Sequence, residues 1–160
     1  MDFRKSFIET LIKLAGEDDK VCLIICDVGF KYAEEFEKRF PQRFWNLGVT
    51  EFSSMAEVTG MALEGMKPYI YSMRNFVLFR PAEAVRNCVV KHNANVKILG
   101  VSGSEGYKFL GFSHNMIHPT EDIDFCKNIG LDYFIPESIN EVKNITEDTY
   151  KSEKSVYIRL

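Results

Sequence analysis

The feature that most constrains the fold is an alternation, along the whole chain, of short apolar runs with longer segments of helical spacing. The clearest run, VCLIIC at residues 21–26, is continuously apolar, which is typical of a strand buried on both faces of a parallel sheet. The preceding segment, residues 4–15, has the pattern of an amphipathic helix. The alternation predicts an α/β fold: a three-layer sandwich with a mostly parallel six-stranded sheet and helices on both faces.

Each element is expected at a definite place. We expect strands at residues 21–26, 43–46, 68–72, 96–101, 133–135 and 156–160, and helices at residues 4–15, 31–39, 51–64, 81–92, 121–128 and 138–150, with a long loop at residues 102–120. Thr120 is placed to N-cap the fifth helix. Because we find no linker, repeat or low-complexity tract, residues 1–160 are predicted to form one domain.

The composition excludes several classes of protein. The net charge is −3 and no basic stripe is present, so nucleic acid is not an expected partner. We find no apolar run as long as a membrane span and no signal-peptide core, which predicts no membrane partner and a cytoplasmic location. The four cysteines form no CxxC pair, and we expect them to be reduced, with no metal site in this chain.

The segments that follow the predicted strands carry most of the unusual residues. Ligands of such sheets bind beyond the carboxyl ends of the strands. The segments are CDVGF, NLGVTE, SMRNF and the loop after the fourth strand. They contain no GxGxxG fingerprint, Walker loop or GxSxG elbow, which argues against the dinucleotide-binding, P-loop and α/β-hydrolase classes.

A single carboxylate, Glu51, opens the helix in RFWNLGVTEFSSMAEVTGMALEG at residues 43–65. This helix is apolar nearly all round, which predicts a buried helix with Glu51 at the mouth of the core. The carboxylate is either a charge that complements the helix N-terminus or a working acid. Taken by itself, the sequence favours the first interpretation, because acidic residues are common in first helical turns.

Taken in order, these segments resemble the pyrimidine-binding domain of transketolase-type thiamine diphosphate enzymes. The resemblance is carried by FRKSFIETL, CDVGF, the segment around Glu51, SMRNFVLFRPAEAVRN, GFSH, HPTEDID and the closing SVYIRL. It implies that Glu51 is catalytic and contacts N1′ of the cofactor's aminopyrimidine. A proton shared there favours the imino tautomer that deprotonates C2 of the thiazolium, and the cofactor performs the carbanion chemistry.

The resemblance also assigns roles to further residues. Phe76 and Phe79 match the aromatic cluster around the pyrimidine, and Asp27 matches an aspartate at the end of the first strand. His114 matches a catalytic histidine that reaches the substrate, and Arg4 matches an arginine that grips its phosphate. For each residue a plainer interpretation stays open: core packing for the phenylalanines, a turn for Asp27, and surface positions for His114 and Arg4.

The chain departs from the family pattern at several places. It has no GDG…N segment, so Mg²⁺ and the diphosphate are expected to be held by a partner chain. Leu110 replaces an acidic residue before the GFSH segment, and Lys31 stands where a serine usually follows Asp27. Lys31 is therefore a candidate substrate-binding cation, and we expect a substrate that is longer or differently charged than short sugar phosphates.

Three functions compete. The first is the pyrimidine-binding subunit of a split transketolase-like enzyme, an oligomer with its diphosphate-binding partner, which transfers a two-carbon ketol unit between sugars or sugar-derived molecules. The second is a non-catalytic assembly or regulatory subunit that retains the fold, an interpretation favoured by Leu110 and Lys31. The third is an unrelated flavodoxin-like module for a nucleotide or flavin, which the lack of a phosphate-binding glycine loop disfavours.

Overall fold

The computed structural model describes residues 2–102 and 105–160 and contains one six-stranded sheet with the order β2-β1-β3-β4-β6-β5. Every registered pairing between its strands is parallel. The strands are β1 (Val21–Ile25), β2 (Phe44–Asn46), β3 (Lys67–Met73), β4 (Lys97–Val101), β5 (Asp132–Phe134) and β6 (Val156–Arg159). The predicted three-layer α/β fold is therefore confirmed.

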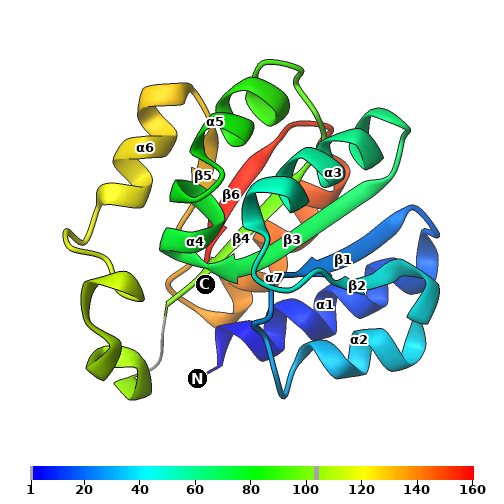
Figure 1. Cartoon of the computed structure of the whole chain (residues 1–160). Helices are drawn as coiled ribbons and strands as arrows, with labels where there is room; N and C mark the ends of the chain where they lie inside the picture. The colour runs from blue at the N-terminus through cyan, green and yellow to red at the C-terminus, as the bar shows by residue number, and fades with distance from the viewer. Residues whose placement is uncertain (1, 103–104) are drawn as a thin grey trace.

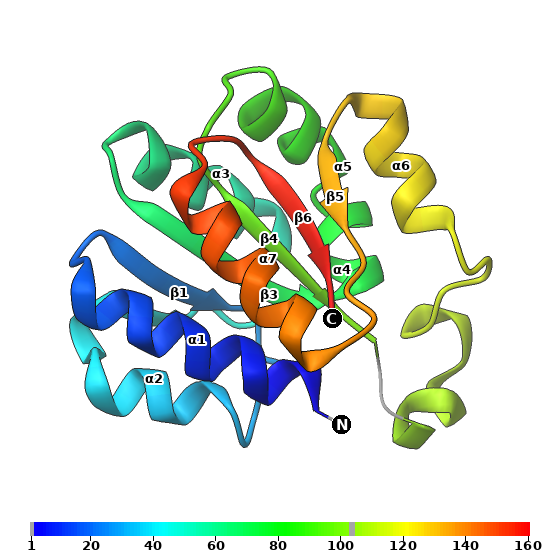
Figure 2. The ribbon, with the colours of Figure 1, turned by 180° about the vertical axis from the view of Figure 1, so that it is seen from behind.

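Helices cover both faces of the sheet. The face seen in Figure 2 carries α1 (Phe3–Glu17), α2 (Ala33–Arg39) and α7 (Ile139–Lys151). The opposite face, seen in Figure 1, carries α3 (Glu51–Leu63), α4 (Arg74–Phe79), α5 (Ala82–Ala84) and α6 (Glu121–Ile129). The remaining helical segments are the 3₁₀ turn η1 (Pro41–Arg43), the π-helical turn η2 (Val85–Val90) and the 3₁₀ segment η3 (Glu105–Ser113).

The two faces of the sheet form two separate apolar cores. Successive residues of β3 alternate between them: Tyr69 packs in the core under α1 and α7, and Ile70 packs in the core under α3 and η2. All five residues of β1 and of β4 are buried. This double burial explains why the strands read as continuous apolar runs.

Lys97, the first residue of β4, is a charged side chain inside this apolar setting. Its ammonium group donates to the Asn95 side chain at 2.6 Å and to the carbonyls of Ser152 and Lys154 at 2.9 and 2.6 Å. Burial lowers the pKa of Lys97 to about 8. These contacts fix the turn that connects α7 to β6.

Gly100 in β4 lies against the side chain of Tyr157. A Cβ atom at this position would lie 2.6 Å from a ring carbon of Tyr157 and closer still to its hydroxyl, far inside van der Waals contact. The ring of Tyr157 is fully buried, and its hydroxyl donates to Asp122 of α6 at 2.8 Å. The absent side chain of Gly100 thus makes room for the contact that fastens α6 to the sheet.

One helix was not expected, and one expectation about a helix is wrong. The helix expected at residues 81–92 is present as α5 and η2, which together cover residues 82–90. The unexpected helix is α4, which begins at Arg74 directly after β3. The helix that begins at Glu51 is not buried all round, since Phe52 is 54% and Leu63 is 57% exposed. Its apolar outer face is left uncovered by the rest of the described chain.

The segment expected as a loop before α6 is partly helical. Residues 105–113 form η3, which is kinked where Gly111 adopts a φ of +65°, a value that glycine tolerates. Thr120 precedes α6 as predicted, but its hydroxyl donates to the Asp124 side chain at 2.8 Å instead of capping the helix. Among the described helices, none has the length and apolar content needed to cross a membrane.

Candidate active site

Glu51, the first residue of α3, lies at the carboxyl edge of the sheet with its side chain only 1% exposed. Its Oε1 accepts a hydrogen bond from the Ser72 hydroxyl at 3.2 Å, and its Oε2 accepts one from Nη1 of Arg80 at 2.8 Å. Buried carboxylates need such partners, because an unpaired charge away from water is strongly unfavourable. The geometry therefore holds both carboxylate oxygens in fixed directions.

A tight turn after β2 places Glu51 at this position. Gly48 has a φ of +69°, and its N–H donates to the side chain of Asn46 at 3.1 Å. Thr50, the N-cap of α3, uses its hydroxyl on the Leu47 carbonyl at 2.7 Å rather than on the helix N–H groups. The helix N-terminus is thereby turned toward the sheet, and the first side chain of the helix enters the core.

Arg80 is stacked on an aromatic ring while it pairs with Glu51. Its guanidinium carbon lies 3.6 Å from the centroid of the Phe76 ring. The two residues are four apart along a continuous helical stretch, so their side chains share one face of it. The Arg80 side chain is 40% exposed, whereas that of Glu51 is 1% exposed. The guanidinium group therefore lies between the buried carboxylate and solvent.

His114 extends this arrangement on the other side of Phe76. The two rings meet edge to face, with centroids 5.0 Å apart and an interplanar angle of 74°. Ser113 Oγ lies 2.8 Å from Nδ1 of His114 and 2.9 Å from the Leu110 carbonyl. The Asn75 side chain donates to the Ser113 carbonyl at 2.7 Å, which ties η3 to α4.

We call Glu51, Ser72, Phe76, Arg80 and His114 the Glu51 cluster. The structure thus brings together three of the residues that the sequence nominated, namely Glu51, Phe76 and His114. They come from α3, from α4 and from the residue directly after η3, which are distant in sequence and meet at the carboxyl edge of the sheet. A buried acid, a flat aromatic face and an imidazole can together hold and proton-couple to a nitrogen heterocycle.

The thiol of Cys26 lies next to this cluster at the end of β1. Burial raises its pKa to about 11, a hydrogen bond with Ser54 opposes this effect, and the nearby Glu51 charge adds to it. The thiol is therefore protonated at neutral pH, and Cys26 packs as a small buried apolar residue. The four cysteines, Cys22, Cys26, Cys88 and Cys126, are all free.

The other nominated residues make their contacts elsewhere. The ring of Phe79 packs edge to face against Phe125 of α6, with centroids 6.0 Å apart. The Asp27 backbone has a φ of +51° and donates to Asn46 at 3.1 Å. Lys31 lines a groove of about 290 Å³ between α1 and α2. Their roles toward a ligand stay predictions.

Arg4 is engaged by residues near the N-terminus of α1. Its Nε lies 3.4 Å from Asp2 Oδ1, and its Nη2 donates to the Tyr32 hydroxyl at 3.2 Å. Tyr32 also donates to Asp2. Although burial opposes it, hydrogen bonds from Tyr32 and the Lys5 N–H, together with the Arg4 charge, lower the pKa of Asp2. A substrate phosphate at Arg4 would have to compete with this ionised carboxylate.

Sequence reasoning missed Arg80 and Ser72 as partners of Glu51. The signal was present in SMRNFVLFR, because a buried acid requires a cationic or hydroxyl partner and Arg80 follows Phe76 by one helical turn. Because residues 74–79 were not assigned to a helix, the shared face of Phe76 and Arg80 was not apparent.

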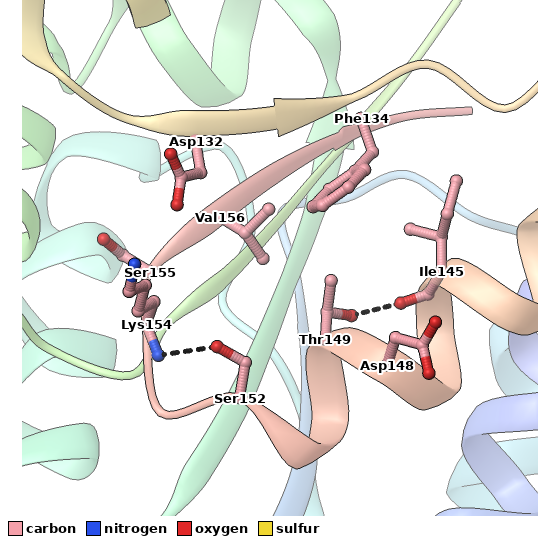
Figure 3. A pocket seen from close by; sticks show the side chains of 9 residues that line it. All are labelled: Asp132, Phe134, Ile145, Asp148, Thr149, Ser152, Lys154, Ser155 and Val156. Carbon is pink, nitrogen blue, oxygen red and sulfur yellow. Dashed lines mark hydrogen bonds between the residues drawn. The ribbon is translucent and has the colours of Figure 1, made fainter.

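A small pocket lies at the amino end of β6, the opposite end of the strands from Glu51 (Figure 3). Its volume is about 150 Å³, and Phe134, Val156 and the end of α7 line it. Its polar groups bond to one another: Thr149 donates to the Ile145 carbonyl at 2.7 Å, and the Lys154 N–H donates to the Ser152 hydroxyl at 3.3 Å. Over the described part of the chain, no group of three or more His, Cys, Asp or Glu residues is arranged to hold a metal ion.

The fold and the Glu51 cluster define an α/β domain of the kind that binds a ligand at the carboxyl edge of a parallel sheet. The particular family follows from comparison with known proteins. The family described as "Transketolase, pyrimidine binding domain" matches residues 1–160, and the chain belongs to this family. The resemblance inferred from the strand-end segments is therefore confirmed.

Among individual proteins, the chain is 29% identical over 159 residues to an apulose-4-phosphate transketolase subunit of Phocaeicola vulgatus. It is 30% identical over 159 residues to a putative transketolase C-terminal section from Methanocaldococcus jannaschii. These matches cover 98% of this chain but 50% and 49% of the two relatives. The chain spans about half the length of these relatives.

Solved structures agree with this assignment. A structure described as "Split gene transketolase, inactive beta4 tetramer" superposes with a TM-score of 0.85 at 27% identity, over 99% of this chain and 50% of that one. A transketolase from Pichia stipitis superposes with a TM-score of 0.81 at 19% identity, over 98% of this chain and 25% of the other. The second likeness concerns the fold alone.

Proposed function

We propose that this chain is the pyrimidine-binding part of a split, transketolase-like transferase that transfers a two-carbon ketol unit with thiamine diphosphate. The observation that carries the proposal is the buried carboxylate of Glu51, held at the first turn of α3 and paired with Arg80, which stacks on the Phe76 ring. A purely capping glutamate would gain nothing from burial, whereas an acid that shares a proton with a ring nitrogen needs a site away from water.

The described residues fit the aminopyrimidine half of this cofactor. Glu51 would accept or share the proton of a ring nitrogen, Phe76 would contact the ring, and His114 would face the substrate from the adjacent position. Phe79 and Asp27 would complete the ring's surroundings. When bound, the cofactor supplies the carbanion chemistry of ketol transfer.

The diphosphate half is proposed to be held by a partner chain. No GDG…N segment occurs in the sequence, and a diphosphate with Mg²⁺ needs several oxygen ligands and cationic donors. Two relatives are named as single subunits of a transketolase, which supports a partner chain. We therefore expect an oligomeric enzyme that is active only with both chains, in a cytoplasmic setting and in carbohydrate metabolism.

The substrate is proposed to be a sugar or sugar-derived molecule. Arg4 is already paired with Asp2 and Tyr32, and Lys31 lies at a different place on the rim, which argues for a longer or differently charged substrate. Two relatives are named for apulose-4-phosphate, which is a short sugar phosphate and favours the opposite alternative. A panel on the reconstituted complex should therefore compare apulose, xylulose and ribose phosphates with unphosphorylated and nucleotide-linked ketoses. A short sugar phosphate giving the highest kcat/KM would refute the substrate proposal.

The experiment that tests the function is Glu51→Gln in the complex reconstituted with the diphosphate-binding chain. Gln keeps the size and hydrogen bonding of Glu51 but cannot share an acidic proton, so exchange of the cofactor's C2 proton should fall by at least about a hundredfold. NMR measures this exchange, and circular dichroism checks the fold. Phe76→Ala, by contrast, should weaken cofactor binding and leave residual turnover.

A non-catalytic assembly subunit is the second candidate. Leu110, which replaces an acidic residue of the family pattern, favours it, and the retained Glu51 cluster opposes it. The same exchange measurement separates the two functions. If the complex shows C2 exchange at the same rate with wild type and with Glu51→Gln, the chain contributes structure rather than catalysis.

A further inference from the structure

The guanidinium of Arg80 makes both of the contacts that the proposed function assigns to a cofactor ring. It donates to the buried carboxylate of Glu51 at 2.8 Å, and it lies over Phe76, 3.6 Å from the ring centroid. A guanidinium and a 4-aminopyrimidine are both flat and carry nitrogen donors in their plane. The position that the Arg80 guanidinium occupies in the free chain would therefore also suit the pyrimidine ring of the cofactor.

We propose that Arg80 is a positioning residue that occupies the ring site in the free chain and is displaced when the ligand binds. This inference rests on the proposed function and adds a gate to the same site. While the site is empty, Arg80 neutralises Glu51 and covers the Phe76 face. Both groups are thereby kept in the geometry that the incoming ring needs.

The surroundings of Arg80 permit this exchange. The side chain is 40% exposed and Glu51 is its ion-pair partner, so the guanidinium can move into water without breaking the apolar core. Glu51 keeps its second hydrogen bond, from Ser72, after Arg80 has left. The carboxylate therefore stays oriented during the exchange, and its Oε2 becomes available to a ring nitrogen.

The exchange also restricts which ligands enter. A ligand that only stacks on Phe76 would leave Glu51 buried and unpaired, which is strongly unfavourable. A ligand that only pairs with Glu51 would leave the Phe76 face exposed. The gate thus selects flat rings with a nitrogen directed at the carboxylate. The apparent affinity equals the intrinsic affinity multiplied by the fraction of chains in which Arg80 has left the site.

The test measures binding of 4-amino-5-hydroxymethyl-2-methylpyrimidine, the pyrimidine half of the cofactor, to the chain by NMR titration. Arg80→Met should bind it at least about tenfold more tightly than wild type, because the competing side chain is gone. Arg80→Lys keeps the charge but lacks the flat guanidinium group. Its affinity should lie between those of wild type and Arg80→Met. Arg86→Met removes an exposed cation on η2 and is the control for net charge, and benzyl alcohol is the control ligand without ring nitrogens.

Each outcome decides between the inference and the proposed function. Tighter binding by Arg80→Met that is lost in the Arg80→Met/Glu51→Gln double variant supports the gate. Equal or weaker binding by Arg80→Met, with wild-type binding lost in Glu51→Gln, overturns the gate and leaves the pyrimidine site intact. Wild-type binding that is unchanged in Glu51→Gln overturns both. No binding by any folded variant overturns the gate in the free chain, while the proposed function is then decided by the C2-exchange measurement on the complex. If Arg80→Met does not fold, Arg80→Gln takes its place, since it keeps a donor for Glu51 without the charge or the plate.

Discussion

Tyr157 and Asp122 are joined by a 2.8 Å hydrogen bond between two fully buried side chains, one on β6 and the other on α6. Arg159 donates to both oxygens of the same carboxylate, with its Nε 3.0 Å from Oδ2. Burial and the Asp122 charge raise the pKa of Tyr157, so its hydroxyl stays a donor over the physiological range. The pair anchors α6, and through Phe125 it anchors the ring of Phe79.

Replacing Asp122 tests this anchor. Asp122→Ala leaves the Tyr157 hydroxyl and the Arg159 guanidinium without their acceptor, and the free energy of unfolding should fall by about 3 kcal/mol. Urea unfolding followed by circular dichroism measures the change. Asp148→Ala, at an exposed carboxylate of α7, is the matched control and should change stability by less than about 0.5 kcal/mol. Equal effects of the two variants would contradict the anchoring role.

Gly100→Ala should destabilise the chain more than an ordinary strand substitution. The new methyl group would lie 2.6 Å from a ring carbon of Tyr157, and this ring cannot move because it is buried and held by Asp122. We expect a loss of about 2 kcal/mol or more in thermal or urea unfolding. Adding Tyr157→Phe should not restore stability, because the ring carbons still clash; full rescue would refute this account.

Lys97 should give stability a specific pH dependence. Its pKa is about 8 in the folded chain and 10.5 without burial, so between these values the unfolded chain binds more protons and stability rises with pH. The Lys97 contribution should increase by about 3 kcal/mol from below pH 8 to above pH 10.5. The difference in unfolding free energy between wild type and Lys97→Met should show this slope. Lys143→Met, which removes an exposed lysine of α7, should not change the slope.

The carboxyl edge of the sheet should mediate association. Phe30, Val49 and Phe52 are more than half exposed there, which is a large apolar surface for an unassociated chain. Phe52→Asp should lower the apparent mass in sedimentation at high concentration. Leu63→Asp, at the other end of α3 and similarly exposed, should have no such effect. A wild-type chain that stays monomeric at all concentrations would contradict this prediction.

The sequence predicted the layers of the fold because apolar period and strand length are local properties. The continuous run of β1 and the amphipathic pattern of α1 needed no tertiary information. The helix expected from residue 81 is present as α5 and η2, but α4 was missed, because residues 74–79 directly after β3 were not assigned to a helix. The exposure of Phe52 could not be predicted, since apolar spacing does not distinguish a core from an uncovered surface.

The sequence predicted the acidic residue of the candidate site but not the residues that hydrogen-bond to it. Glu51, Phe76 and His114 were nominated by their segments, and the structure gathers them at one edge. Arg80 and Ser72 act through Glu51, and a contact between residues 51 and 80 is set by how α3 and α4 cross the sheet. Spacing along the chain does not contain that crossing, so the ion pair could be found only in three dimensions.

The position of β6 has a consequence for how the chain is made. This strand follows the other five in sequence, yet it lies between β4 and β5 in the sheet. During synthesis from the amino terminus, β5 therefore has no neighbour and β4 keeps one open side until residues 156–159 emerge. The nascent chain must keep these edges from pairing with other chains, so aggregation of incomplete chains should depend on the time that separates β5 from β6.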